Sequence, residues 1–201
     1  DDCGVCDGDD SPNTGTCDCA GIPDGDVVED CAGVCDGTAE IDICGNCGGD
    51  NSLCTWYVNN LFGFDTLGVG FGTELSPYSS IQYAIDSSSD GDTVLVSAGT
   101  YVEHIAFNGK NIVVQGENRE TTIIYGGGQT GSAVTFANGE DLTAAISGFT
   151  IKNGKTMGNG GGIYCSNSSP NISNVTISGN EAQYGGGIYC SNSSPNISNV
   201  T

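Results

Sequence analysis

The chain has 201 residues and sets 25 Asp and Glu against only four Lys and Arg, for a formal net charge of −21. Such an acidic chain is a poor partner for nucleic acid or an anionic membrane, because both are negatively charged. It contains no apolar run of about eighteen residues and no basic-then-apolar leader, so neither a membrane span nor a signal peptide is predicted. Because it starts without Met and stops within a repeat, we expect a piece of a longer protein.

Residues 1–54 form a region rich in Cys and Asp, built from a short repeat. Cys19-Ala-Gly-Ile-Pro-Asp-Gly and Cys31-Ala-Gly-Val-Cys-Asp-Gly are copies twelve residues apart, and Pro23 takes the place of the second Cys. So many thiols are unusual in a reducing cytosol and ordinary in a secreted disulfide scaffold. We therefore predict an oxidising, extracellular compartment. The disulfide candidates are Cys3, Cys6, Cys17, Cys19, Cys31, Cys35, Cys44, Cys47 and Cys54.

The order of this region must come from cross-links, because it has too few large apolar residues to bury a core. We expect small loops without regular secondary structure. The connectivity stays open, although Pro23 requires Cys19 to pair outside its own unit, with Cys17, Cys54 or a cysteine upstream of Asp1. The Cys-x-x-Cys pairs at Cys3 and Cys44 also suit zinc, but the repeated pattern without His favours disulfides.

The carboxylates of this region lie in Gly-rich turns, which suits oxygen-ligated calcium. Simple solvated acidity explains them equally well, so both interpretations stay open. No organic cofactor is indicated. The candidate calcium ligands are Asp7, Asp9, Asp10, Asp24, Asp26, Asp36 and Asp50.

After a connecting segment at 55–76, which we interpret as the entry to a second domain at 77–201, one short helix is predicted. Ile81, Ala84 and Ile85 follow Ser80 at helical spacing, so this helix would cap the open end of a repeat structure. Strand-like runs bounded by Gly or Asn follow it and predict irregular first coils. These runs are 93–96, 105–107, 112–114, 122–124 and 133–136.

The last part of the chain is a regular repeat. The 25 residues from Gly160 to Tyr184 start again, without change, at Gly185. Each copy holds short alternating segments separated by turn residues, and such a unit must stack on its neighbours to cover its apolar face. We predict three short parallel strands per coil, with Cys165 stacked on Cys190. For the two thiols we favour buried, unpaired side chains over a disulfide between coils.

Four segments resemble the opening of pectin-lyase-like right-handed β-helix proteins of secreted bacterial type: Ser80-Ile-Gln-Tyr-Ala-Ile-Asp, Asp90-Gly-Asp-Thr-Val-Leu-Val, Ala98-Gly-Thr-Tyr-Val-Glu and Asn111-Ile-Val-Val-Gln-Gly. The resemblance implies an all-β, right-handed parallel β-helix. Its function stays open, since that scaffold serves lyases, hydrolases, esterases, adhesins and spacers. Residues 1–54 resemble the Asp-Cys-Gly-Val-Cys-Gly-Gly-Asp repeats of large bacterial surface proteins, which implies a secreted or cell-surface protein.

No catalytic residue is predicted. Between Leu142 and Thr201 the only acid is Glu181 and the only bases are Lys152 and Lys155, too few for a lyase or a hydrolase site. A further group near the helix is explained by cap loops and strand ends: Asp86, Asp90, Asp92, Glu103 and His104, the last expected at the surface. We therefore expect a protein that is not an enzyme, an extracellular stalk or adhesive rod.

Two alternatives remain: a carbohydrate-active β-helix enzyme with catalytic coils beyond Thr201, and a subunit of an extracellular fibril. Carbohydrate and other surface proteins are the expected partners, and a homo-oligomer is compatible with the open ends of a solenoid. Asn-x-Ser/Thr sequences also suggest glycosylation, against the competing interpretation that Asn favours the turns of a β-helix. These candidates are Asn167, Asn171, Asn174, Asn192, Asn196 and Asn199.

Overall fold

The structure, a computed structural model, describes residues 18–22, 26–42, 44, 47–49, 53–65 and 71–201. The chain divides into two compact units, Asp1–Ser52 and Leu53–Thr201. Every helix and strand that the described residues form belongs to the second unit. None of the helices in the described part is long and apolar enough to cross a membrane.

The described residues of the first unit are loops held by interleaved disulfides. Cys19 is bonded to Cys35 and Cys31 to Cys47, each across 16 residues of sequence. Asp30 organises the loop between them, because its carboxylate accepts hydrogen bonds from the backbone N–H groups of Val34 and Ala39. These hydrogen bonds hold the pKa of Asp30 below its ordinary value. The expectation of disulfide-tied loops is confirmed for this part of the chain.

The partner of Cys19 corrects the sequence interpretation. Cys19 does pair outside its own repeat unit, but with Cys35 and not with the cysteines that we considered. In both bonds the first Cys of one unit reaches the second Cys of the next. Cys44 and Cys54 are also disulfide-bonded, whereas Cys3, Cys6 and Cys17 lie outside the described residues.

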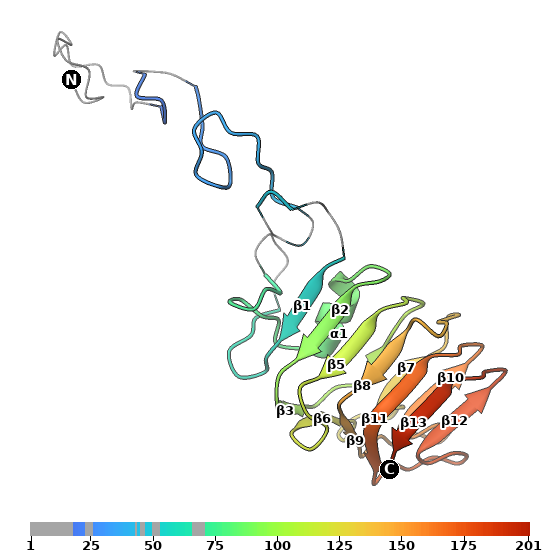
Figure 1. Cartoon of the computed structure of the whole chain (residues 1–201). Helices are drawn as coiled ribbons and strands as arrows, with labels where there is room; N and C mark the ends of the chain where they lie inside the picture. The colour runs from blue at the N-terminus through green and yellow to red at the C-terminus, as the bar shows by residue number, and fades with distance from the viewer. Residues whose placement is uncertain (1–17, 23–25, 43, 45–46, 50–52, 66–70) are drawn as a thin grey trace. The chain divides into compact units, whose positions relative to one another are not determined.

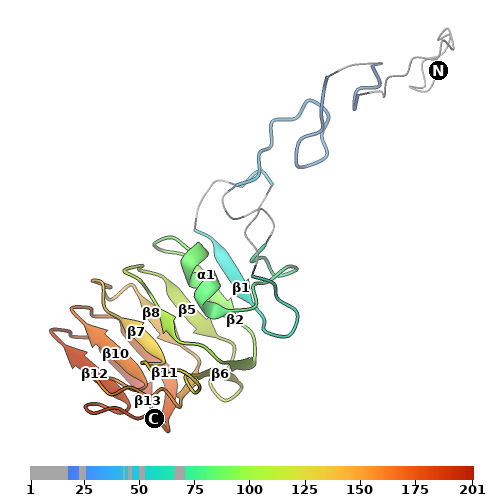
Figure 2. The ribbon, with the colours of Figure 1, turned by 180° about the vertical axis from the view of Figure 1, so that it is seen from behind.

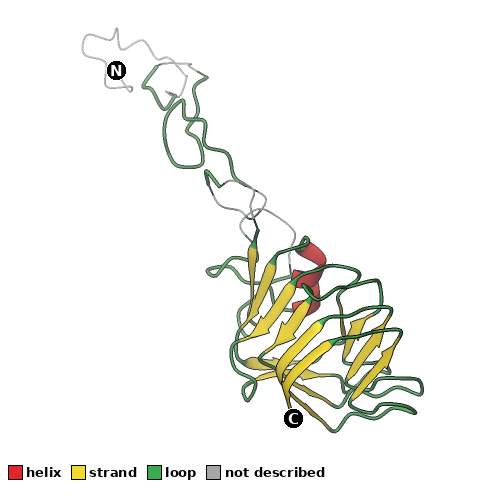
Figure 3. Ribbon diagram, turned by 45° about the vertical axis from the view of Figure 1, so that its right-hand side comes forward, coloured by secondary structure: helices red, strands yellow, loops and turns green. Residues whose placement is uncertain are grey.

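The second unit is a right-handed parallel β-helix with three sheets (Figures 1 and 3). The first sheet holds β1 (Thr55–Val58), β2 (Thr93–Val96), β5 (Val113–Gly116), β8 (Ala145–Ser147), β11 (Asn171–Ser178) and β13 (Asn196–Val200). The second holds β3 (Gly99–Tyr101), β6 (Thr122–Tyr125), β9 (Thr150–Lys152) and the end of β11. The third holds β4 (Ile105–Ala106), β7 (Val134–Phe136), β10 (Ile163–Ser166) and β12 (Ile188–Ser191). The predicted fold class is confirmed.

The core is a set of side-chain stacks that run from coil to coil. Ile146 pairs in register with Ile172, and Ile172 with Ile197, as the repeat predicts. Cys165 pairs in register with Cys190, and both thiols are free, as expected. Cys165 is buried, but Cys190 is exposed, because it lies on the edge strand β12, and this corrects the expectation that both side chains are buried. Burial raises the pKa of the Cys165 thiol, which makes it a poor nucleophile.

Helix α1 (Ile81–Ser87) caps the solenoid at its first coil (Figure 2). Its buried residues pack against β1, β2 and β4, which belong to two different sheets. The Ser80 hydroxyl accepts a hydrogen bond from Tyr83 N, and the Glu103 carboxylate accepts from Ile81 N and Gln82 N. The ammonium group of Lys110 donates to three carbonyls at the other end, those of Ile85, Asp86 and Ser88. Because both helix ends are satisfied, so short a helix is stable here.

Neither β1 nor β3 lies within the strand-like runs that were predicted from the sequence. β1 lies within the segment 55–76 and pairs with β2 along its whole length, and β3 precedes β4. Trp56 and Val58 of β1 are buried, and the buried carboxylate of Asp92 accepts hydrogen bonds from Cys54 N and Trp56 Nε1. The entry to the solenoid is therefore already a paired strand.

Candidate functional site

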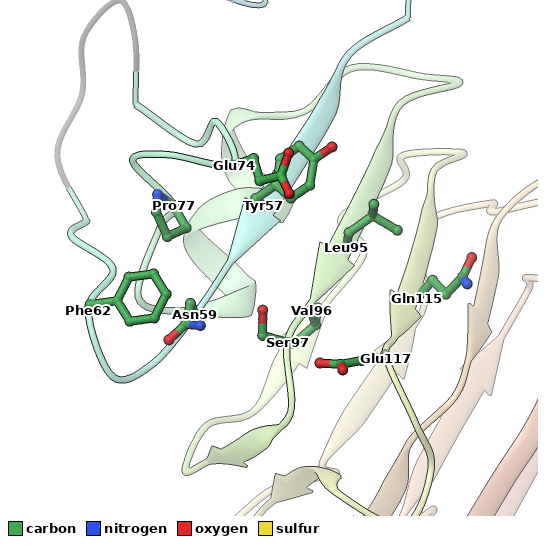
Figure 4. Close-up of a pocket in the computed structure, with 11 residues that line it drawn as sticks. Tyr57, Asn59, Phe62, Glu74, Pro77, Leu95, Val96, Ser97, Gln115 and Glu117 are labelled. Carbon is green, nitrogen blue, oxygen red and sulfur yellow. The ribbon is translucent and has the colours of Figure 1, made fainter.

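A cavity of about 420 Å³ lies on the outer face of the first sheet, over its first three strands (Figure 4). One wall consists of residues from β1, β2 and β5, and the other of the segment that follows β1. A cavity of this size accommodates a small organic group or a sugar unit. Its lining residues are Tyr57, Asn59, Phe62, Glu74, Pro77, Leu95, Val96, Ser97, Gln115, Gly116 and Glu117.

The period of the strands places three of these side chains side by side. Tyr57 pairs in register with Leu95, and Leu95 with Gln115, so all three point outward from neighbouring strands. The residues between them, among them Val58 and Val114, point inward and are buried. Outward-facing positions on stacked strands thus form a row along one face.

A second row follows where these strands end. Each of the three strands is followed directly by a polar residue: β1 by Asn59, β2 by Ser97 and β5 by Glu117. Backbone hydrogen bonds continue the pairing here, from Ser97 N to Val58 O and from Glu117 N to Val96 O. The polar groups of three consecutive coils therefore meet at one edge of the cavity.

The opposite wall is a segment that folds back along β1. Tyr57 N donates to Gly72 O, Tyr78 N to Tyr57 O and Asn59 N to Tyr78 O, each at 2.8 or 2.9 Å. Gly72 has a positive φ of 75°, and a Cβ there would lie 2.5 Å from the Tyr78 ring. Only glycine fits this close approach. The fold-back brings Glu74 and Pro77 beside the outward row of the sheet.

Asp65 anchors this wall to the helix cap. Its carboxylate accepts hydrogen bonds from Ser79 N at 2.8 Å and from the Ser80 hydroxyl at 2.9 Å. Burial alone would raise the pKa of Asp65, but the hydrogen bonds from Ser79 and Ser80 outweigh it and hold the pKa below its ordinary value. The carboxylate stays ionised, and the wall stays joined to α1.

Tyr101 supports the cavity from inside the solenoid, at the ends of β1 and β2. Its hydroxyl donates to Ser97 O at 3.0 Å and lies 3.4 Å from Val58 O. Burial raises the pKa of Tyr101 to about 12, so the hydroxyl remains a donor across the physiological range. Tyr101 therefore fixes the ends of β1 and β2 against each other.

Two carboxylates face the cavity from different walls. Glu117 uses Oε2 to accept a hydrogen bond from Ala98 N at 2.9 Å, which orients the group while its other oxygen has no partner in the described structure. Glu74 is exposed, and no described residue donates to its carboxylate. Leu95 and Ser97 lie between the two carboxylates in the view of Figure 4. Carboxylates in this state can accept hydrogen bonds or protons from a bound molecule.

The acids near the helix accept hydrogen bonds from neighbouring loops and from the helix itself. Asp90 accepts a hydrogen bond from Asn111 N, Asp86 one from the Gln82 amide, and Glu103 holds the helix start. His104 departs from expectation, since it is half-buried and its ring nitrogens lie 2.8 and 2.9 Å from the carbonyl oxygens of Ser132 and Gly126 on the next coil. It joins two coils and does not enter the cavity.

The calcium hypothesis stays a prediction. Asp7, Asp9, Asp10, Asp24 and Asp50 lie outside the described residues, whereas Asp26 and Asp36 are described. In the part of the chain that can be searched, no three His, Cys, Asp or Glu side chains gather in a way that could hold a metal.

The glycosylation candidates lie at coil corners and strand starts. Asn167, Asn174, Asn192 and Asn199 have positive φ values near 50°. Their amides form hydrogen bonds from coil to coil, Asn192 to Asn167 and Asn199 to Asn174. Asn171 and Asn196 pair with each other in β11 and β13. Glycosylation at any of the six stays a prediction.

Comparison with solved structures identifies the architecture. The chain is similar to a mutant pectin methylesterase in complex with a hexasaccharide, with a TM-score of 0.53 and 15% identity over 72% of this chain and 48% of that one. A second complex of pectin methylesterase with a hexasaccharide gives a TM-score of 0.48 and 14% identity over 67% of this chain and 45% of that one. This chain thus spans about half the length of these esterases. No family model matches the sequence, and no curated protein does.

This comparison corrects the expectation that the chain is not an enzyme, because the similar structure is an enzyme with the same β-helix fold. The expectation relied on the absence of catalytic groups from the regular coils. The cavity, however, lies on the first coils, where the repeat has decayed and outward positions differ from strand to strand. Aligning Asp90-Gly-Asp-Thr-Val-Leu-Val with Asn111-Ile-Val-Val-Gln-Gly would have indicated that Gln115 and Glu117 face outward.

Proposed function

We propose that this chain carries the sugar-binding site and the general base of a carbohydrate-active β-helix enzyme that hydrolyses a bond in or on a polysaccharide. The cavity on the first sheet supports this most strongly, because it combines aromatic walls, amide and hydroxyl groups and two carboxylates with open oxygens. The methylesterase with the same fold was solved with a hexasaccharide. The disulfides indicate an extracellular protein, where polysaccharide substrates occur.

The lining residues divide into those that hold a sugar ring and those that can move a proton. Tyr57 and Phe62 offer aromatic surface to the apolar face of a ring, while Gln115 offers an amide to its hydroxyls. Glu117 is the proposed general base, since Ala98 N orients one oxygen and leaves the other open. In this role it accepts a proton from the attacking water, whose oxygen forms a bond to the carbon under attack. The bond from that carbon to the departing oxygen breaks, and the proton passes to this oxygen to give a free hydroxyl group.

The test is hydrolysis of a polysaccharide panel, measured by new reducing ends for glycosidic bonds and by released methanol or acetate for esters. Glu117→Gln is expected to lower kcat by about 100-fold or more, the usual contribution of a general base. Glu120→Gln is the matched control, because Glu120 is exposed, lies three residues further along and does not line the cavity. Full activity of Glu117→Gln would contradict the assigned role, and a panel without binding or turnover would contradict the proposed function.

The sugar-holding role of the aromatic wall has its own matched pair. Phe62 is 60% exposed and lines the cavity, whereas Phe64 is 64% exposed and does not. Phe62→Ala should raise KM by about tenfold, the loss of roughly one stacking contact. Phe64→Ala should leave KM unchanged. Equal effects of the two substitutions would indicate a role in folding of the loop, not in binding.

A further inference from the structure

The charge of the cavity restricts which sugars it can take. Its lining includes Glu74 and Glu117 and contains no Lys, Arg or His among the described residues. A ligand in this cavity therefore meets two acidic groups and no basic group.

The basic residues of the chain do not compensate these carboxylates. Lys110 is held by the carbonyls at the end of α1, Lys155 pairs with Glu181 at 2.6 Å, and Lys152 lies over the Tyr125 ring. Arg119 follows Glu117 by two residues but does not line the cavity. The second unit itself carries eleven Asp and Glu against these four basic residues, so its wider surface adds to the negative field.

Carboxylates with open oxygens accept hydrogen bonds, and the hydroxyl groups of an uncharged sugar donate them. A uronate unit would bring a third carboxylate into the same cavity. Placing like charges together is unfavourable unless a cation intervenes, and the repulsion weakens as salt screens it. Tyr57 and Phe62 add aromatic surface that suits the apolar face of a neutral ring.

We infer that this cavity selects uncharged sugar units and rejects uronate units. The inference rests on the proposed function and deepens it by naming the substrate class. Open oxygens on Glu74 and Glu117 bind sugar hydroxyls, and the same two groups repel an anionic sugar. An unesterified polyuronate is therefore excluded as the substrate, whereas a neutral glycan is accepted.

The experiment measures binding of paired hexasaccharides by calorimetry with the whole chain. Neutral glucan and galactan hexamers are compared with hexamers of glucuronate and galacturonate at about 20 mM and about 500 mM salt, since salt screens exposed charges. The neutral hexamers should bind at least about tenfold more tightly than the uronates at low salt, and the ratio should shrink at high salt. In the Glu74→Gln/Glu117→Gln variant the same ratio should fall toward one, while Glu120→Gln should keep it.

The possible outcomes separate the two claims. Uronates that bind as tightly as neutral hexamers, or more tightly, overturn the charge selection and leave the proposed function standing. A preference for neutral hexamers that survives in the double variant also overturns it, because the selection would then come from other groups. Absence of binding by every hexamer contradicts the proposed function and, with it, the inference.

Discussion

The first coils of the solenoid, from β1 to β7, and the last, from β10 to β13, share the same sheets but present different surfaces. On the last coils each outward position repeats, so that Ser173 pairs with Ser198 and Tyr164 stacks on Tyr189. On the first coils the equivalent row of the first sheet reads Tyr57, Leu95 and Gln115. The same backbone therefore carries either a ladder or a set of different groups.

The difference shows which coils of a repeat fold can form a functional site. A ladder of identical residues stabilises the solenoid, since each hydrogen bond or stack recurs at every coil. A binding site needs different groups at neighbouring positions, which identical coils do not provide. Near-perfect copying at one end of a solenoid therefore says nothing about the other end, where the cavity lies.

The largest expected effect compares substitutions along one core stack. Phe136, Cys165 and Cys190 occupy the same register position on β7, β10 and β12. Phe136→Ala should lower the free energy of unfolding by about 3–5 kcal/mol, because Phe136 is fully buried and packs on Phe107 with ring centroids 4.1 Å apart. Cys190→Ala should change it by less than about 0.5 kcal/mol, because Cys190 is exposed. Urea unfolding of both variants gives the comparison.

Cys165→Ala provides the intermediate point, because its side chain is buried but small. An unfolding free energy that falls equally for all three substitutions would mean that the last coils are packed as tightly as the first. A Phe136→Ala change close to zero would show that the Phe107 and Phe136 pair is not part of a continuous core.

The second prediction concerns the seam between the two sets of coils. Glu140 is buried and accepts hydrogen bonds from Gly109 N, Asn138 N and the Ser168 hydroxyl, which belong to successive coils. Burial alone would raise its pKa, but these hydrogen bonds outweigh it and hold the pKa below the ordinary 4.5. Glu140→Gln should lower the free energy of unfolding by about 1–3 kcal/mol at neutral pH, because the NH2 group of glutamine would face hydrogen-bond donors.

The stability difference between wild type and Glu140→Gln should also depend on pH, and this is the sharper measurement. Because the folded pKa of Glu140 is lowered, its contribution is complete above the unfolded value of 4.5 and is lost as the pH falls through the folded pKa. Thermal unfolding of wild type and Glu140→Gln should therefore converge below pH 4.5. A stability difference that stays constant from pH 7 to the acid range would show that the carboxylate charge is not what joins the coils.

Most of the fold was predictable from the sequence because its signals are local. Ser80 before Ile81, Ala84 and Ile85 marks the helix, and an exact repeat of Ile172 at Ile197 marks stacked coils. The strand β1 was missed because its partner Thr93–Val96 is distant in sequence and nothing near Trp56 repeats. A long-range pairing without a repeat leaves no periodic signal.

The candidate site was harder to predict, since its two walls come together only in the folded chain. The outward position of Glu117 could have been predicted from the register of neighbouring strands. Glu74 was not, because its position depends on the fold-back in which Tyr57 N bonds to Gly72 O and Gly72 N to Ser76 O. Irregular turns of this kind follow from tertiary contacts, among them Gly72 against Trp56 and Tyr78, and not from local propensity.

The smallest expected effect tests the ladders of the last coils. Asn174 has a φ of 51°, and its side-chain oxygen accepts a hydrogen bond from the Asn199 amide at 3.1 Å. Asn174→Ala should cost about 1 kcal/mol, because alanine tolerates the left-handed region less well and forms no ladder. Asn174→Gly should cost less, since glycine removes the backbone strain while losing the same hydrogen bond. If urea unfolding gives glycine the larger loss, relief of backbone strain is not what decides the residue at these corners.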